Sequence, residues 1–240
     1  MEATALARRL ADAGVDATVS FAGRVERPKR QPLPTRIGGF GGAEGLAAHI
    51  RQAGVTHVVD ATHPFAARMS RNAVAACRAT GTPLCRLSRP PWTERTGDRW
   101  MRVPDIAGAV AALDRPRTRV MLAVGRMHLD AFAPNPQHAY LIRLVDPPAA
   151  PLALPEIEVI VDRGPFDAEA DRALMVRHGT GLVVSKNSGG AGAYAKIAAA
   201  RALGLPVVMI DRPALPPATE ATDPEGVLAW LSHASADLGV

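Results

Sequence analysis

The chain has few aromatic residues, few cysteines and no long apolar run. Phenylalanine, tryptophan and tyrosine make up 4% of its 240 residues, while 48% of the residues are apolar. Because these are mostly Ala, Val and Leu, the composition favours helices packed on parallel sheets over a β-sandwich. No run is long enough to cross a bilayer and no secretory signal opens the chain, so we predict a cytoplasmic protein without a membrane partner.

The chain also lacks the residue spacings of metal sites. Its two cysteines, Cys77 and Cys85, form no spaced pair, and its seven histidines follow no metal-ligand pattern. We therefore predict no metal and a reducing compartment. The net charge of +5 is spread along the chain rather than gathered on one helix. This distribution favours small acidic ligands over nucleic acid. The sequence leaves the oligomeric state open between a monomer and a small homo-oligomer.

Short β-branched runs alternate with helical stripes along the whole sequence, which predicts an α/β fold with mainly parallel sheets flanked by helices. The Pro90-Pro91 pair and Gly97 mark the predicted boundary between one domain at residues 1–97 and a second at 98–240. A last strand and helix complete the second domain in this interpretation. We expect an exposed basic loop from Arg24 to Arg36 and a helix soon after Gly125.

The segment that starts at Asp60 closes the apolar run Val55 to Val59 and opens a helix. Thr62 or His63 can serve as the N-cap, and Pro64 suits the first helical turn because it has no N–H to leave unpaired. Ligands of α/β folds bind beyond the carboxyl ends of strands, where helix N-termini attract anions. Thr62 and His63 are therefore candidate cofactor-binding residues, although the alternative, that they only cap the helix, stays open.

A second loop of this kind follows the apolar run at 181–184 and precedes a predicted helix from Ala193. Its glycines let backbone N–H groups approach an anion, a lysine adds charge, and two serines and an asparagine add neutral hydrogen bonds. It is not a Walker A loop, and its match to Gly-x-Gly-x-x-Ala lies too far beyond the strand to carry weight. A flexible surface loop is the alternative. The candidate cofactor-binding residues are Ser185, Lys186, Asn187, Ser188, Gly189 and Gly190.

Arg24 differs from the other cations of its loop because it directly follows Ala22-Gly23 at the end of a predicted strand. An arginine at this place in a nucleotide-binding unit can pair with a 2′-phosphate and select NADP over NAD. We predict that Arg24 has this role and that the remaining cations of the loop are solvated.

Four motifs occur in one chain and in one order: residues 36–42 (Arg-Ile-Gly-Gly-Phe-Gly-Gly), 60–65 (Asp-Ala-Thr-His-Pro-Phe), 89–92 (Arg-Pro-Pro-Trp) and 185–190 (Ser-Lys-Asn-Ser-Gly-Gly). Together they resemble the precorrin-6A reductase family, and the likeness extends from Glu2 to about Pro213. The resemblance implies two Rossmann-like domains and NADPH-dependent reduction of a tetrapyrrole double bond, precorrin-6A to precorrin-6B, in cobalamin biosynthesis. The cobalt-containing substrate belongs to the anaerobic branch of the same family.

The resemblance also suggests roles for single residues. Gly39 joins the candidate cofactor-binding residues, and three arginines near strand ends suit the carboxylates of a tetrapyrrole, namely Arg86, Arg89 and Arg126. Reduction of a double bond needs a proton as well as a hydride, and His63 or Lys186 can supply it, as can solvent. These two residues are the catalytic candidates.

The start of the chain departs from the family pattern. Members open with a short apolar strand and a Gly-Gly-Thr-x-Glu-Ala loop, whereas this chain reads Met1-Glu2-Ala3. We expect that the natural protein begins several residues earlier and that a strand and a phosphate-binding loop belong ahead of Met1. A second class stays open: a protein that binds NADPH or a tetrapyrrole without turnover, as a sensor or as an inactive truncated form.

Overall fold

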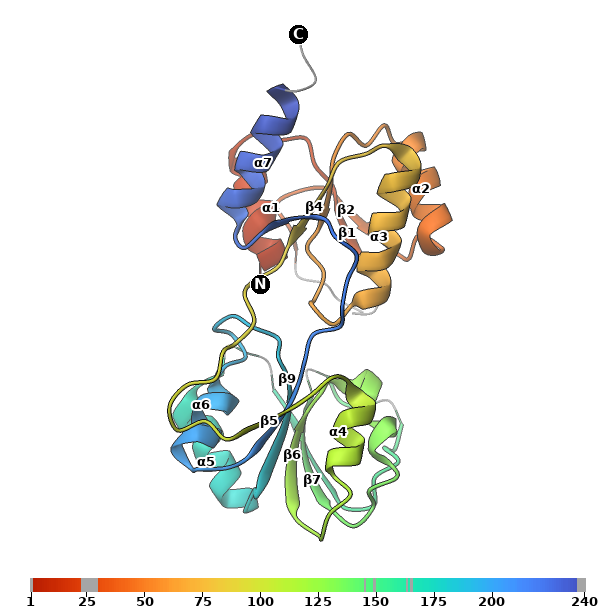
Figure 1. Cartoon of the computed structure of the whole chain (residues 1–240). Helices are drawn as coiled ribbons and strands as arrows, with labels where there is room; N and C mark the ends of the chain where they lie inside the picture. Colours follow the sequence, from red (N-terminus) through yellow and green to blue (C-terminus); the bar gives the residue numbers. More distant parts are fainter. Residues whose placement is uncertain are drawn as a thin grey trace. The chain divides into compact units, whose positions relative to one another are not determined.

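A computed structural model of the protein describes residues 2–22, 30–144, 146–148, 150–162, 164 and 166–236. The chain forms two compact units, one made of Met1–Pro90 with Ala214–Val240 and the other of Pro91–Pro213. Each unit contains parallel strands flanked by helices (Figure 1), which confirms the predicted α/β class. No helix in the described part of the chain has the length and apolar character needed to span a membrane.

The first unit has short parallel strands between two pairs of helices. Helices α1 and α7 pack on each other on one side of the unit, and α2 and α3 pack on the other (Figure 1). Its strands are arranged as β1–β2 and β11–β4–β3, with every pairing parallel. The elements are α1 (Glu2–Asp12), β1 (Val19–Phe21), β2 (Thr35–Ile37), α2 (Gly42–Gln52), β3 (Val58–Asp60), α3 (Ala67–Thr80), β4 (Leu84–Leu87), β11 (Thr219–Ala221) and α7 (Pro224–Ala236).

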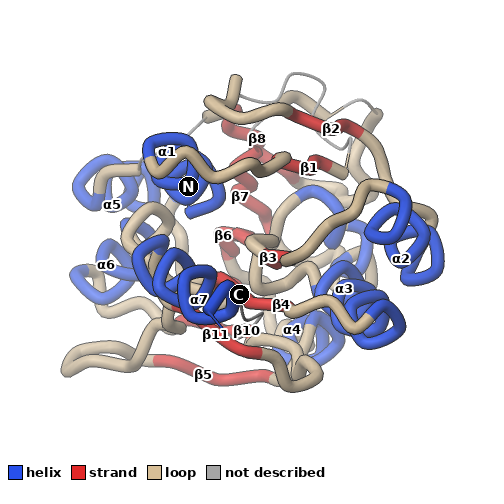
Figure 2. The backbone as a smooth tube through the Cα atoms, turned by 90° about the horizontal axis from the view of Figure 1, so that it is seen from above, coloured by secondary structure: helices blue, strands red, loops and turns tan. Residues whose placement is uncertain are grey.

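Among the described residues, the sheet of the first unit is in two parts. β1 pairs only with β2, and β3 is the end strand of the β11–β4–β3 sheet (Figure 2). The strand and loop expected ahead of Met1 stay a prediction.

The second unit is built on a six-stranded parallel sheet in the order β5-β10-β9-β6-β7-β8. Helix α4 covers one face, and α5 and α6 cover the other (Figure 1). The elements are β5 (Trp100–Val103), α4 (Ile106–Ala112), β6 (Arg119–Ala123), the 3₁₀ turns η1 (Arg126–His128) and η2 (Asp130–Phe132), β7 (Ala139–Leu144), β8 (Ile157–Val161), α5 (Ala168–His178), β9 (Leu182–Lys186), α6 (Ala195–Ala202) and β10 (Val207–Ile210).

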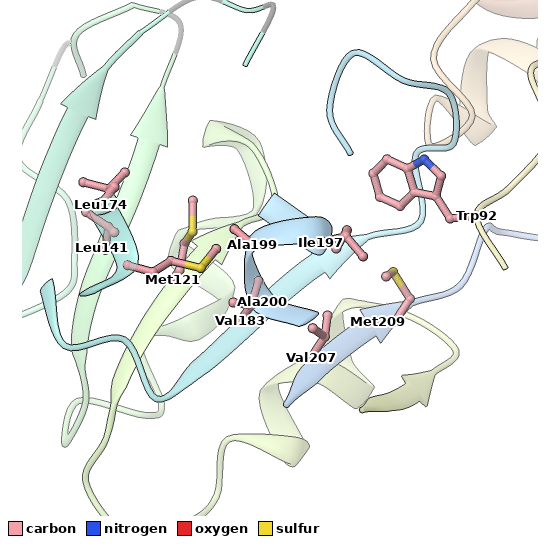
Figure 3. Packing of buried hydrophobic residues seen from close by; sticks show 11 residues of the cluster. Trp92, Met121, Leu141, Leu174, Val183, Ile197, Ala199, Ala200, Val207 and Met209 are labelled. Carbon is pink, nitrogen blue, oxygen red and sulfur yellow. The ribbon is translucent and has the colours of Figure 1, made fainter. Parts of the chain in front are cut away.

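One part of the core of this second unit lies between the sheet and the α5–α6 layer. Figure 3 shows side chains of β6, β9 and β10, including Met121, Val183 and Met209, in one cluster with Ile197 of α6. Each of these four side chains is at most 1% exposed. Trp92 belongs to the same cluster, so the segment that begins the unit is anchored in its core.

The division of the chain differs from the one expected at residues 97 and 98. The boundary falls between Pro90 and Pro91, and the last strand and helix join the first unit. β11 pairs with β4 there, and α7 contacts α1. A terminal strand and helix fit the edge of any parallel sheet, so periodicity does not indicate which sheet they join.

Three local expectations were wrong. The predicted helix after Gly125 consists of two 3₁₀ turns, η1 and η2. The expected basic loop contains strand β2 at its end, where Thr35–Ile37 pair with β1. The N-cap of α3 is Ala66, which makes no side-chain cap bond, rather than Thr62 or His63.

Candidate functional site

The strand order of the second unit marks one place on its sheet for a ligand. From β6 the chain proceeds outward through β7 to β8, then returns to place β9 on the other side of β6. Such a reversal opens a crevice beyond the carboxyl ends of the two central strands, where ligands of open α/β sheets bind. Ala123 of β6 lies opposite Ser185 of β9 at these ends. The loops after Ala123 and after Lys186 therefore form the candidate site.

Lys186 ends β9 at this edge and is only 9% exposed. Burial lowers the pKa of its ammonium group to about 8, because desolvation disfavours the charged form. A lysine with this pKa is mostly cationic at neutral pH and yet releases its proton more easily than a solvated one. The neighbouring Ser185 is fully buried and its hydroxyl donates to the Lys186 carbonyl, so that hydroxyl supports the backbone.

Asn187 and Ser188 are held from within the unit. The Asn187 side chain accepts from the Trp92 N–H at 2.7 Å and donates to the Trp92 carbonyl at 2.9 Å. The Arg212 guanidinium donates to the carbonyls of Asn187 at 3.0 Å and Ser188 at 3.1 Å. The Asn187 side chain thus serves the loop's shape, and a ligand role for Asn187 stays a prediction. These contacts could not be predicted from the sequence, because Trp92 and Arg212 are far from this loop along the chain.

The glycines of the loop adopt left-handed backbone conformations, with φ of 70° at Gly189 and 69° at Gly190. Residues with a side chain rarely take this conformation, so glycine is needed at both positions. Glycines in such a turn let backbone N–H groups approach an anion closely.

The opposite loop, after β6, adds an arginine and a histidine. Gly125 turns the chain with φ of 79°, and Arg126 follows as an exposed residue at the start of η1. His128, in the same turn, is half-buried, and both burial and the charge of Lys186 lower its pKa. His128 was not among the sequence candidates, because a single histidine in a loop has no distinguishing pattern.

A cavity of about 150 Å³ lies at the same end of the sheet. Lys196 of α6, Asp171 of α5 and Arg143 of β7 line it, and Arg143 and Asp171 form a buried ion pair. Burial lowers the Lys196 pKa to about 8, although the nearby Asp171 carboxylate acts in the opposite direction. This cluster was not predicted from the sequence. Each of its residues lies on a helix or strand, and the pattern of apolar residues there is equally compatible with a solvent-exposed side chain.

The first unit presents a second polar edge, after β3. The Asp60 carboxylate accepts from the Thr62 N–H at 3.1 Å and from the Thr62 hydroxyl at 2.6 Å. His63 Nδ1 accepts from the Phe65 N–H at 3.2 Å, and its ring lies 5.9 Å from that of Phe65. Both Thr62 and His63 are exposed. Their side chains thus stabilise the turn that leads to α3, and their contact with a cofactor stays a prediction.

Two of the three candidate substrate arginines have carboxylate partners in the first unit. Arg86 is buried and donates to Glu220 at 2.7 Å and to the Pro216 carbonyl at 3.0 Å. Arg89 donates to Glu2 at 2.5 Å. These contacts link β4 to β11 and to the segment before it, and they link the residues after β4 to α1. A substrate role for either arginine requires an exchange of partners and stays a prediction.

The glycine-rich stretch before α2 folds around Arg36. The Arg36 guanidinium donates to the carbonyls of Gly38 at 2.6 Å and Gly39 at 3.0 Å, and it lies 4.0 Å from the centre of the Phe40 ring. Gly39 therefore contributes its carbonyl to the loop's own structure. Arg24 lies outside the described residues. Among the residues that the structure describes, no group of three or more His, Cys, Asp or Glu is placed to hold a metal ion.

Comparison with known proteins gives consistent matches over nearly the whole chain. The sequence model of the family described as Precorrin-6x reductase CbiJ/CobK matches residues 1–232. The chain is 55% identical to the Precorrin-6A reductase of Rhodobacter capsulatus, over 100% of this chain and 96% of that protein. It is 32% identical to the Cobalt-precorrin-6A reductase of Priestia megaterium, over 88% and 87%. A solved structure of CobK precorrin-6A reductase superposes with a TM-score of 0.93 at 55% identity, over 98% of this chain and 93% of that one.

Proposed function

The chain belongs to the Precorrin-6x reductase CbiJ/CobK family, and on that basis we propose that it catalyses NADPH-dependent reduction of one double bond of precorrin-6A. The product is precorrin-6B, an intermediate of cobalamin biosynthesis. The observation that carries this proposal is the position of Lys186 and the glycine loop after it, at the switch point of the six-stranded sheet.

The residues at this edge fit a dinucleotide phosphate. Gly189 and Gly190 let backbone N–H groups of the loop approach an anion, and the Lys186 ammonium group adds a positive charge. These residues would hold a phosphate of NADPH, and Arg24 would select its 2′-phosphate. When bound, NADPH supplies the hydride that reduces the macrocycle. The protein then has to orient the two reactants, and orientation alone can account for about 7–11 kcal/mol of a barrier.

The substrate is also strongly anionic, because a precorrin has acetate and propionate groups around its ring. The chain's net charge of +5 favours both ligands. Arg126 is the most accessible of the three arginine candidates, since it is exposed beside the switch point. Arg86 and Arg89 would contribute only if a substrate carboxylate replaced Glu220 or Glu2 as their partner.

Addition of a hydride to one carbon of the double bond requires a proton on its neighbour. Lys186, with its pKa lowered to about 8, holds a proton at neutral pH and releases it at a modest cost in free energy. His63 is the second candidate and solvent the third. We further propose a cytoplasmic location, where NADPH is available.

Oxidation of NADPH in the presence of precorrin-6A, followed by the loss of reduced-nicotinamide absorbance, tests the proposal. We expect turnover that requires precorrin-6A, with a higher kcat/KM for NADPH than for NADH. Binding of NADPH without any oxidation would instead identify a sensor or an inactive form. Equal kcat/KM for the two cofactors would contradict the role of Arg24.

A further inference from the structure

Two residues far apart in the sequence hold three carbonyl groups of the loop between β9 and α6. The Trp92 indole N–H donates to the Gly190 carbonyl at 2.7 Å. The Arg212 guanidinium donates to the carbonyls of Asn187 and Ser188 at 3.0 and 3.1 Å. Trp92 is the second residue of its unit and Arg212 the second-last. Both segments that connect the units are therefore fastened to this loop.

These bonds also fix the directions of two N–H groups. The C=O and N–H of a planar trans peptide point in opposite directions. Since the Ser188 carbonyl faces Arg212, the Gly189 N–H points away from Arg212. Likewise, the Gly190 carbonyl faces Trp92, so the Ala191 N–H points away from Trp92. Within the described ranges, neither N–H donates to a backbone carbonyl.

A buried side chain holds the same segment from the α6 end. Lys196 donates to the Ala193 carbonyl at 2.6 Å, and its ammonium group lies 5.1 Å from the centre of a Trp92 ring. Four carbonyls of the loop thus accept from cations or an indole N–H, whereas the amide hydrogens of Gly189 and Ala191 point away from these donors. Such a distribution of partial charge favours an anionic oxygen near these two amide hydrogens.

We propose that Trp92 and Arg212 are positioning residues that aim the N–H groups of Gly189 and Ala191 at an anionic oxygen of a ligand. The oxygen belongs to a phosphate or to a carboxylate, and its identity rests on the proposed function, which supplies NADPH and a polycarboxylate as the two sources. Trp92 and Arg212 touch no reacting atom in this account, and they act through the loop.

Two conservative substitutions test the proposal. Trp92→Phe keeps an aromatic ring in the core cluster and beside Tyr194 but removes the indole N–H. Arg212→Lys keeps the charge and removes the planar pair of donors. Arg102→Gln is the matched control, because Arg102 pairs with Asp211, next to Arg212, on the exposed side of the same connecting segment.

We expect each test variant to raise one KM about ten- to hundredfold, the effect of losing a hydrogen bond to a charged group, with kcat little changed. An increase in the KM of NADPH identifies a phosphate, and an increase in the KM of precorrin-6A identifies a carboxylate. The control should stay within about twofold of the wild type. If both KM values are unchanged in both variants while the thermal midpoint falls, the contacts are purely structural and the proposal is overturned.

Binding of inorganic pyrophosphate, measured by titration calorimetry, separates this proposal from the proposed function. If the wild type oxidises no NADPH, the proposed function fails, but pyrophosphate still reports on the loop. A dissociation constant raised about tenfold in Trp92→Phe and Arg212→Lys then supports the aimed N–H groups. In that case, the proposal is overturned if the wild type does not bind pyrophosphate, or if the wild type and both variants have equal dissociation constants.

Discussion

The Asp171 carboxylate lines the cavity of the second unit together with two largely buried cations, Arg143 and Lys196. Its side chain is 2% exposed and pairs with Arg143, which is 11% exposed and stacks 4.3 Å from the Phe166 ring centre. Lys196 is 8% exposed, and the Asp171 charge raises its pKa against the effect of burial. Asp171→Asn keeps the side-chain shape and removes the negative charge. Because it leaves two buried cations without a carboxylate to offset their charge, we expect a loss of about 3–5 kcal/mol in the free energy of unfolding.

The loss should also depend on pH. The pKa of Lys196 is about 8 in the folded protein, below the usual lysine value. The unfolded chain therefore binds more protons than the folded protein above about pH 8, so stability contributed by this group increases with pH there. Removal of Asp171 lowers the Lys196 pKa further. The deficit of Asp171→Asn should therefore shrink between about pH 7 and about pH 9.

Urea unfolding of both proteins at the two pH values measures these differences, provided that the m-values agree. Glu156→Gln is the control, because it removes one partner of an ion pair whose two side chains are exposed, Arg117 and Glu156. Such pairs contribute at most about 1 kcal/mol. A deficit for Asp171→Asn no larger than that of the control, or one that does not change with pH, would refute the buried charge cluster as a source of stability.

Three further predictions concern other groups. Lys186→Met should raise the KM of NADPH, and wild-type affinity for NADPH should fall as pH increases through about 8, where the ammonium proton is lost; steady-state kinetics at several pH values measure both, and a pH-independent affinity would argue against a phosphate contact. Burial raises the pKa of the Cys77 thiol to about 11 and also that of Cys85, so both should react with a thiol reagent only after denaturant is added; rapid labelling of the native protein would contradict this. Arg86→Met should destabilise the protein by about 3 kcal/mol, because it leaves the 5%-exposed Asp60 without its cation; urea unfolding measures the change, and a loss near zero would indicate that the pair is not needed.

Most of the fold could be predicted because helix and strand periods are local properties. Leu6 and Leu10 give α1 its apolar face, and Gly81 ends α3 in a left-handed conformation, both as expected. The short strands β2 and β5 were missed, since three or four residues show too little alternation to be recognised. The pairing of β11 with β4 was also not predictable, because it depends on tertiary packing.

The location of the candidate site could be predicted from the sequence, but the hydrogen bonds within it could not. The glycines at 189 and 190 indicated a loop for an anion, and Lys186 does lie at its start. An asparagine side chain can form the same hydrogen bonds with a ligand or with a backbone. The sequence therefore did not reveal that the Asn187 side chain bonds to the Trp92 backbone. The burial of Lys196 could not be predicted from the sequence either, because it depends on how α5 and the sheet pack against α6.

The central claim is that this chain transfers a hydride from NADPH to the tetrapyrrole, and isotope transfer tests it most directly. NADPH deuterated at the transferable position of its nicotinamide ring is incubated with precorrin-6A and the protein, and the product mass is recorded. We predict a reduced macrocycle that contains one deuterium, together with oxidised cofactor in equal amount. Recovery of unchanged precorrin-6A with NADPH bound, or of a reduced product without the label, would contradict direct hydride transfer.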